Sequence, residues 1–132
     1  MSVIVDTCVW SSALRRKKSD QNIAAKLTEL ITHNQVVILG PIRQEILSGI
    51  VDPRQFEQLK NHLAAFIDFP ISPAHYETAA KFFNICRSKG IQGSHVDFLI
   101  CAISTMETME LYTTDKDFIH YKKFLDIHLY AD

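Results

Sequence analysis

Short apolar runs alternate with longer segments of helical pattern along this chain, and that alternation limits the folds open to it. The longer segments carry apolar residues three and four positions apart, and no hairpin turn joins one run to the next. Strands connected through helices run parallel, and a parallel sheet is covered by helices on both faces. We therefore predict a three-layer α/β fold around a central, mostly parallel sheet of about five short strands, at 2–5, 36–39, 67–69, 111–113 and 127–130.

Residues that begin and end helices mark the segments between these strands. Pro41 suits the start of one helix, and Ser94 can cap another. Asp20 is expected to cap the second helix, which Asn34 can end in a left-handed conformation, while Gly90 ends the long helix that begins at residue 73. We expect helices over 7–16, 20–34, 41–49, 53–66, 73–89 and 94–103, and a short helical turn over 118–124.

Length and composition narrow the class of protein. A chain of 132 residues favours one domain, here 1–132, and 47% hydrophobic and 22% charged residues are ordinary for a globular fold, so disorder is not expected. No apolar run approaches the ~20 residues that span a bilayer, and the start lacks a basic segment, so we expect a cytoplasmic protein. Cys8, Cys86 and Cys101 form no close pair, and we expect small buried hydrophobes rather than disulfides or zinc ligands.

Four acidic residues stand where a parallel sheet places its ligands. Asp6 ends the first strand, and Asp115 comes just after the strand at 111–113. Asp97 lies in the first turn of its helix, and Glu45 lies one turn into the helix that follows the second strand. Because ligands bind beyond the carboxyl ends of the strands in such sheets, we expect the four side chains to meet in one crevice.

Carboxylates that converge in this way need a counter-charge. They repel one another, which raises their pKa values unless a cation neutralises them. Ligands that are all oxygen select Mg²⁺ or Mn²⁺ over zinc, and such an ion suits hydrolysis of phosphodiester bonds. No Ser-His-Asp or Cys-His grouping suggests covalent catalysis. His95, two residues before Asp97, is either a surface or capping histidine or a group for proton transfer.

Each acid also has an ordinary structural interpretation. Asp97 can serve only as a negative charge at a helix N-terminus. Asp6 and Asp115 can be turn residues at strand ends, and Glu45 can be a solvated helix residue. Only their expected position at one edge of the sheet favours a shared site.

Four segments resemble a known family when they are taken together. VIVDTCVW, PIRQEIL, SHVDFLICA and TTDKDF occur in this order and resemble the signature segments of PIN-domain nucleases, most of all the VapC-type ribonuclease toxins of toxin–antitoxin pairs. The resemblance covers essentially the whole chain and implies a PIN-like three-layer sandwich. It also implies endonucleolytic cleavage of RNA, a homodimer, and inhibition by a cognate antitoxin protein.

The resemblance also assigns roles to individual residues. It implies catalysis by the four acids, with Mg²⁺ or Mn²⁺ held by Asp6, Asp97 and Asp115. It implies supporting roles for the hydroxyl groups of Thr7 and Thr113, which steady the site. It also implies a supporting role for Asp117, the second acid of the last motif. Cys101 stands where relatives usually carry alanine.

A basic run and two apolar helices complete the predictions. The run follows the helix that begins at the site, and it is expected either to contact the RNA backbone or to be a solvated turn; it comprises Arg15, Arg16, Lys17 and Lys18. The helices at 53–66 and 73–89 carry more apolar side chains than a small sheet can cover, unless they pack on each other. We expect part of this surface to bind a second copy and an antitoxin.

Three other functions fit parts of the pattern. A PIN nuclease of RNA processing or decay would have the same site and no antitoxin. A magnesium-binding phospho-acceptor domain would need a well-placed lysine, and Lys116 is misplaced for that role. A non-catalytic RNA-binding module would need exposed aromatic residues on strands, whereas the aromatic residues here fall mostly on helix faces.

Overall fold

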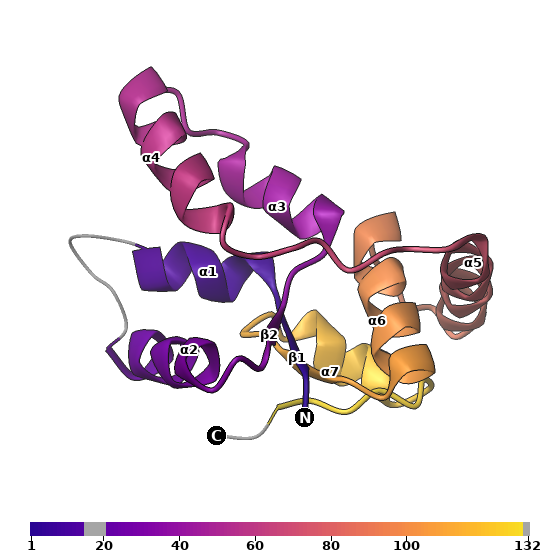
Figure 1. Cartoon of the computed structure of the whole chain (residues 1–132). Helices are drawn as coiled ribbons and strands as arrows, with labels where there is room; N and C mark the ends of the chain where they lie inside the picture. Colours follow the sequence, from indigo (N-terminus) through magenta and orange to yellow (C-terminus); the bar gives the residue numbers. More distant parts are fainter. Residues whose placement is uncertain (15–20, 131–132) are drawn as a thin grey trace.

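The fold is known from a computed structural model, which describes residues 1–14 and 21–130 (Figure 1). Its sheet has three parallel strands in the order β2-β1-β3. They are β1 (Val3–Val5), β2 (Val36–Val37) and β3 (Glu110–Tyr112). In the register of the sheet, Val3 lies opposite both Val36 and Glu110. The central strand is β1, so the residue that follows it stands in the middle of the carboxyl edge.

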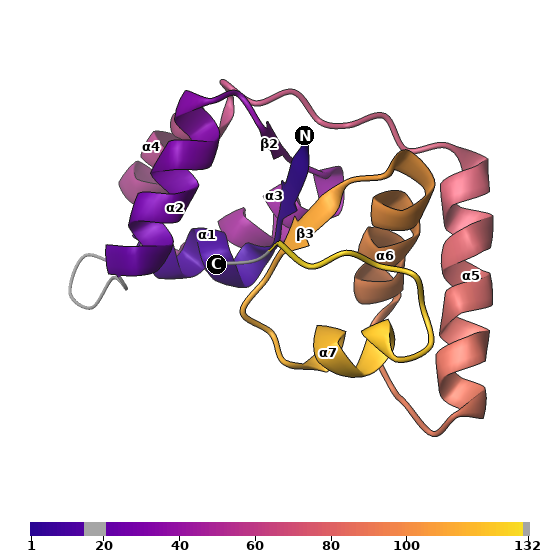
Figure 2. The same ribbon diagram turned by 90° about the horizontal axis from the view of Figure 1, so that it is seen from below.

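Helices cover both faces of this sheet. Figures 1 and 2 show α1 and α2 on one side and α5 and α6 on the other, with α3 and α4 extending from the α1 side. The three-layer α/β arrangement is therefore confirmed. No helix in the described ranges is long and apolar enough to cross a membrane. The helices are α1 (Thr7–Leu14), α2 (Gln21–Thr32), α3 (Gly40–Leu47), α4 (Pro53–Leu63), α5 (Pro73–Ser88), α6 (His95–Glu107) and α7 (Asp117–Lys122).

Several helix boundaries lie where the sequence predicts them. Pro41 lies in the first turn of α3, and the Ser94 hydroxyl accepts a hydrogen bond from the Asp97 amide at 3.0 Å at the start of α6. Asn34 after α2 and Gly90 after α5 both have positive φ, 55° and 78°. The predicted cap at residue 20 and the basic run at 15–18 lie outside the described residues.

The core explains why the strands are continuous apolar runs. All three residues of β1 are buried because helices press on both faces of the sheet. In α6 the seven residues from 98 to 104 are all buried, since the helix lies between the sheet and α5. His75 fastens this pair of helices, because its Nε2 lies 2.8 Å from Oε2 of Glu107.

The sheet is smaller than predicted. The expected strands at 67–69 and 127–130 are each reduced to one parallel bridge, Ile38 with Asp68 and Leu111 with Leu129. The strand expected over 36–39 stops at Val37, because Leu39 already caps α3. Apolar composition placed the right segments beside the sheet, but it could not show how few backbone hydrogen bonds they make there.

The two apolar helices predicted at 53–66 and 73–89 are α4 and α5, and they do not pack mainly on each other. Such packing was the alternative to the prediction that part of their apolar surface is exposed. α5 packs on α6, whereas α4 packs on α3, and Figure 1 places α4 and α5 at opposite ends of the molecule. Leu63 is buried, but Tyr76 on α5 remains 55% exposed. α5 thus leaves apolar surface uncovered in the isolated chain, whereas Phe56 and Leu59 on α4 are half-buried.

Candidate active site

The carboxyl ends of the strands bring the predicted acids to one edge of the sheet. Asp6 follows β1 directly, and the segment 113–115 follows β3. α3 begins just beyond β2, which places Glu45 beside the same edge. Asp97 arrives from the first turn of α6. The side chains are positioned by four different elements, so their relative placement depends on the packing of the whole domain.

Asp6 is the buried centre of the site. Its side chain is only 8% exposed, and its two carboxylate oxygens accept hydrogen bonds from several neutral donors. The Thr7 amide donates to Oδ1 at 2.8 Å, and the Thr113 hydroxyl donates to Oδ2 at 2.8 Å. A buried carboxylate is costly unless such donors or a cation satisfy it. The donors fix the orientation of Asp6 without cancelling its charge.

The hydroxyl of Thr113 also organises the loop that carries Asp115. It accepts a hydrogen bond from the Asp115 amide at 3.0 Å while it donates to Asp6. Oδ1 of Asp115 in turn accepts from the amide of Asp117 at 2.9 Å, which starts α7. Asp117 itself is exposed. Thr113 is therefore the link between the acids that follow β1 and β3.

Glu45 is joined to the centre through one hydroxyl group. The Thr7 hydroxyl donates to Oε1 of Glu45 at 3.0 Å, while the Thr7 amide binds Asp6. Glu45 is exposed to solvent, unlike Asp6. The two predicted supporting threonines thus lie on either side of Asp6 and connect it to Glu45 and to Asp115.

Asp97 is held by a buried tyrosine. The hydroxyl of Tyr121, whose side chain is completely buried, donates to Oδ2 of Asp97 at 2.7 Å. Burial raises the pKa of Asp97 above its usual range, and the negative charges of Asp6 and Asp115 raise it further, although hydrogen bonds from Tyr121 and Ser94 act in the opposite direction. The three aspartates are therefore close enough to interact through their charges.

The chemistry of the donors fits a magnesium-type ion. Among the described residues, none of the four acids forms an ion pair with Lys, Arg or His, so no side-chain cation there neutralises them. The same residues contain no group of three His, Cys, Asp or Glu side chains close enough to surround one ion. Mg²⁺ does not need such a cage, because it is usually bound by one or two carboxylates together with waters and substrate phosphates.

Comparison with known proteins assigns the family. Residues 3–124 match the sequence model of the PIN domain. The chain belongs to the PIN domain family. PIN domains are generally nucleases that use divalent metal ions, which agrees with an all-oxygen site at the sheet edge. No curated protein sequence matches the chain.

Solved structures share the whole fold at low sequence identity. FitAcB from Neisseria gonorrhoeae is 18% identical, with a TM-score of 0.79 over 98% of this chain and 96% of that one. VapBC2 from Rickettsia felis, bound to a DNA fragment from the promoter of its genes, is 17% identical, with a TM-score of 0.80 over 100% of both chains. VapBC-1 from nontypeable Haemophilus influenzae is 14% identical, with a TM-score of 0.77 over 99% and 98%. At these identities the likeness establishes the PIN fold.

Cys8 was predicted to lie in the core, but the structure places it at this PIN site. Cys86 and Cys101 are buried as predicted, but the prediction for Cys8 is wrong. Cys8 is only half-buried, and its Sγ donates to Oδ2 of Asp6 at 3.6 Å and lies 3.5 Å from the Thr113 hydroxyl. The sequence signal for this placement is that Cys8 lies in the first turn of α1, two residues after Asp6.

Tyr121 and His95 complete the surroundings of Asp97. No local pattern could reveal the role of Tyr121, because it is 24 residues from Asp97 in sequence. His95 is exposed at the start of α6, and its ring stacks on that of Phe83 with centroids 5.1 Å apart and planes 17° from parallel. The stacking fits a surface histidine, one of its two interpretations.

The raised pKa of Asp97 predicts how stability depends on pH. A carboxyl whose folded pKa lies above its unfolded value destabilises the fold at neutral pH and stops doing so as the pH falls through the folded pKa. We therefore expect the metal-free Asp97→Asn variant to unfold at a higher temperature than the wild type near pH 7, and the gap to narrow as the pH is lowered. Thermal unfolding of both proteins in chelator checks this. A gap that widens toward acid would refute the electrostatic account of Asp97.

Proposed function

We propose that this PIN domain is a cytoplasmic, metal-dependent endoribonuclease and the toxin of a VapBC-type pair. The observation that carries the proposal is the meeting of Asp6, Asp97 and Asp115 at one sheet edge without a neutralising cation among the described residues. Membership of a nuclease family supports the reaction class. The likeness to structures of VapBC and FitAcB proteins supports the toxin–antitoxin setting.

The proposed chemistry divides the acids into two roles. When bound, Mg²⁺ or Mn²⁺ lowers the pKa of a water molecule and neutralises charge on the leaving oxygen. Asp6, Asp97 and Asp115 would hold the ion, one or two of them directly and the others through its bound waters, with Thr113 and Tyr121 fixing two of these carboxylates. Of the four acids Glu45 alone is exposed, and its carboxylate can accept the proton that the attacking water gives up. Asp117 would keep the Asp115 loop in place through its amide.

The test of this chemistry is cleavage of RNA by the purified chain. We expect internal cuts in total cellular RNA with Mg²⁺ or Mn²⁺ and none in chelator. Because water rather than the ribose 2′-hydroxyl is the nucleophile, the products should carry no 2′,3′-cyclic phosphate, and a strand with 2′-O-methyl groups beside the cut should still be cleaved. Cyclic phosphate ends would rule out the proposed mechanism even if cleavage depended on metal.

Two grooves support the proposed partners, one mostly apolar and one lined by apolar and polar residues in equal number. One of about 470 Å³ lies between α3, α5 and α6, and we propose that a second copy of the chain covers it. Its lining includes Pro41, Tyr76, Ala80 and Val96. The other, of about 330 Å³, lies between the end of α1 and α4, and we propose it for the antitoxin. It is lined by three apolar and three polar residues, which are Leu14, Ile50, Leu59, Gln55, Gln58 and His62.

Light scattering tests both partner proposals. At micromolar concentration we expect a dimer, which Tyr76→Asp should shift toward monomer because it places a charge in the apolar groove between α3, α5 and α6. Co-expression with the product of the adjacent gene should add a second protein to the complex and suppress cleavage. A strict monomer that gains no partner would contradict both proposals. It would favour a PIN nuclease of RNA processing or decay.

The basic run at 15–18 stays a proposed RNA contact, since it lies outside the described residues. Arg15, Arg16, Lys17 and Lys18 follow the helix that starts at Asp6 in sequence. Neutralising all four should weaken RNA binding and flatten its dependence on salt. The slope of log K against log salt should fall by roughly 0.7 for each phosphate of a single strand that the run neutralises. An unchanged slope would mean that the run does not bind the backbone.

A further inference from the structure

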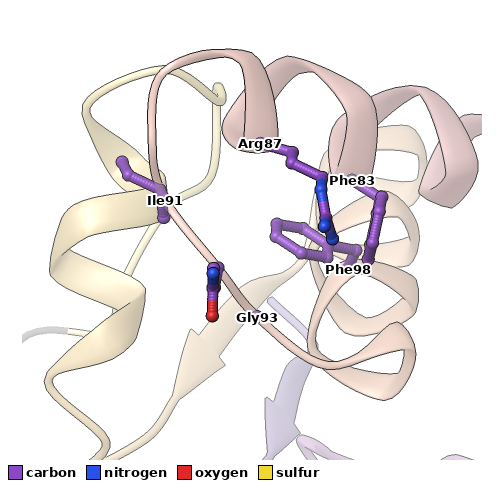
Figure 3. Close-up of a pocket in the computed structure, with 6 residues that line it drawn as sticks. Phe83, Arg87, Ile91, Gly93 and Phe98 are labelled. Atoms are coloured by element: carbon purple, nitrogen blue, oxygen red, sulfur yellow. The ribbon is translucent and has the colours of Figure 1, made fainter.

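A small cavity opens beside Asp97, between the end of α5 and the segment that leads into α6. Figure 3 shows Phe83 and Arg87 on one side of it, with Phe98, and the segment carrying Ile91 and Gly93 on the other. Its volume is about 180 Å³. Pockets for drug-sized ligands hold about 300–1,000 Å³. The cavity is therefore of a size for one planar ring system rather than for a larger ligand.

The side chains that line the cavity include an arginine and two phenylalanines, residue types on which flat rings stack in proteins. Arg87 lies over the Phe83 ring, with its guanidinium carbon 5.7 Å from the ring centroid. Phe98, which is buried, meets Phe83 edge to face at 5.6 Å, and His95, which does not line this cavity, stacks on Phe83 at 5.1 Å. Arginine planes and aromatic rings are the surfaces on which proteins stack unpaired bases. Within the described part of the chain, Arg87 has no acid at ion-pair distance, so its positive charge is not neutralised by a carboxylate there.

The cavity shares a wall with the acidic site. Gly93 lines the cavity, and a Cβ at this position would clash with the Tyr121 hydroxyl and lie 2.9 Å from Cε2 of Phe98. The same hydroxyl donates to Asp97 at 2.7 Å. One tyrosine hydroxyl thus separates the wall of the cavity from a carboxylate of the site.

We infer that this cavity binds the base of an unpaired nucleotide next to the scissile phosphate of RNA. The inference rests on the proposed nuclease function and names a feature of its substrate. The base stacks on the exposed guanidinium plane of Arg87, which lies over the Phe83 ring, and the exposed amide of Gln92 can donate to and accept from its edge. A base in a duplex cannot enter, so cleavage falls in loops and single strands rather than in helices.

Two measurements test the base subsite, and one of them does not need cleavage. In NMR titrations with the four nucleoside 5′-monophosphates, at least one should shift the amides of Gln92 and Gly93 saturably, whereas ribose 5-phosphate should not. In cleavage of a single-stranded RNA, Arg87→Lys keeps the charge and removes the stacking plane, so kcat/KM should fall about tenfold. Lys81→Ala removes a charge from the exposed surface of the same helix and should cleave like the wild type.

The outcomes separate this inference from the proposed function. Absence of shifts with all four nucleotides, or equal shifts with ribose 5-phosphate, would overturn the base subsite. Nucleotide shifts combined with wild-type cleavage by Arg87→Lys would mean a site for free nucleotides and would also overturn it. If the chain cuts no RNA, the nuclease proposal fails, and the titration alone still decides whether the cavity binds a base.

Discussion

Asp97→Asn is expected to reduce RNA cleavage by at least about a hundredfold while the protein stays folded. Loss of a group that only orients a metal ligand typically costs 10- to 100-fold, and loss of a ligand itself should cost more. The amide oxygen of asparagine can still accept the Tyr121 hydrogen bond. Because the surroundings of Asp97 raise its pKa, they disfavour its charge, so removing that charge should leave stability equal or higher.

Asp6→Asn and Asp115→Asn should lose cleavage to a similar extent. Asp126→Asn is the matched control, since its side chain is 87% exposed and lies outside the site. Cleavage rates and thermal midpoints of the four variants should be measured together. An aspartate whose asparagine variant cuts RNA at the rate of the control does not belong to the site.

Gly93→Ala is expected to cost about 1–3 kcal/mol of stability, the usual penalty for an added methyl group in a packed region. The new Cβ would press on the Tyr121 hydroxyl and on Phe98. Since that hydroxyl holds Asp97, a displaced tyrosine should also lower cleavage, and a misplacement of 1 Å can cost about a hundredfold. Gly40→Ala is the control, because its Cβ would meet only Asp68 Oδ2, at 3.7 Å.

A double-mutant comparison isolates the contact responsible. Tyr121→Phe removes the hydroxyl that the new methyl group would strike first, so Gly93→Ala should cost less stability in that background than in the wild type. Tyr121→Phe alone should weaken binding of Mn²⁺, because Oδ2 of Asp97 loses its donor. Equal costs of Gly93→Ala in both backgrounds, measured by urea unfolding, would place the clash elsewhere.

The sequence predicted the layers and the location of the acids because both depend on local patterns. β1 and β3 are short apolar runs, and each is followed closely by an aspartate beyond its carboxyl end, Asp6 and Asp115. In a parallel sheet those ends share one edge whatever the details of packing. The Ser94 cap likewise depends on three neighbouring residues, and it places Asp97 in the first turn of α6.

Features that depend on distant residues could not be predicted. The hydrogen bond from Tyr121 to Asp97 and the clearance that Gly93 gives to Tyr121 arise only when α7 packs against α6. The segments at 67–69 and 127–130 look like strands in composition, yet each makes a single bridge. Cys8 has the apolar neighbours of a core residue in sequence, yet its thiol lies beside the Asp6 carboxylate.

The central claim is that Asp6, Asp97 and Asp115 hold a divalent ion with which the protein cleaves RNA. Removing the metal and adding it back tests this claim most directly. The purified chain should be freed of metal with chelator, dialysed, and assayed on RNA before and after Mg²⁺ or Mn²⁺ is added, beside Asp97→Asn and Asp126→Asn. We predict that no protein cleaves RNA without metal. Added metal should restore cleavage fully in the wild type and in Asp126→Asn, but it should not restore cleavage in Asp97→Asn. Cleavage that persists in chelator, or that returns equally in Asp97→Asn, would contradict the account.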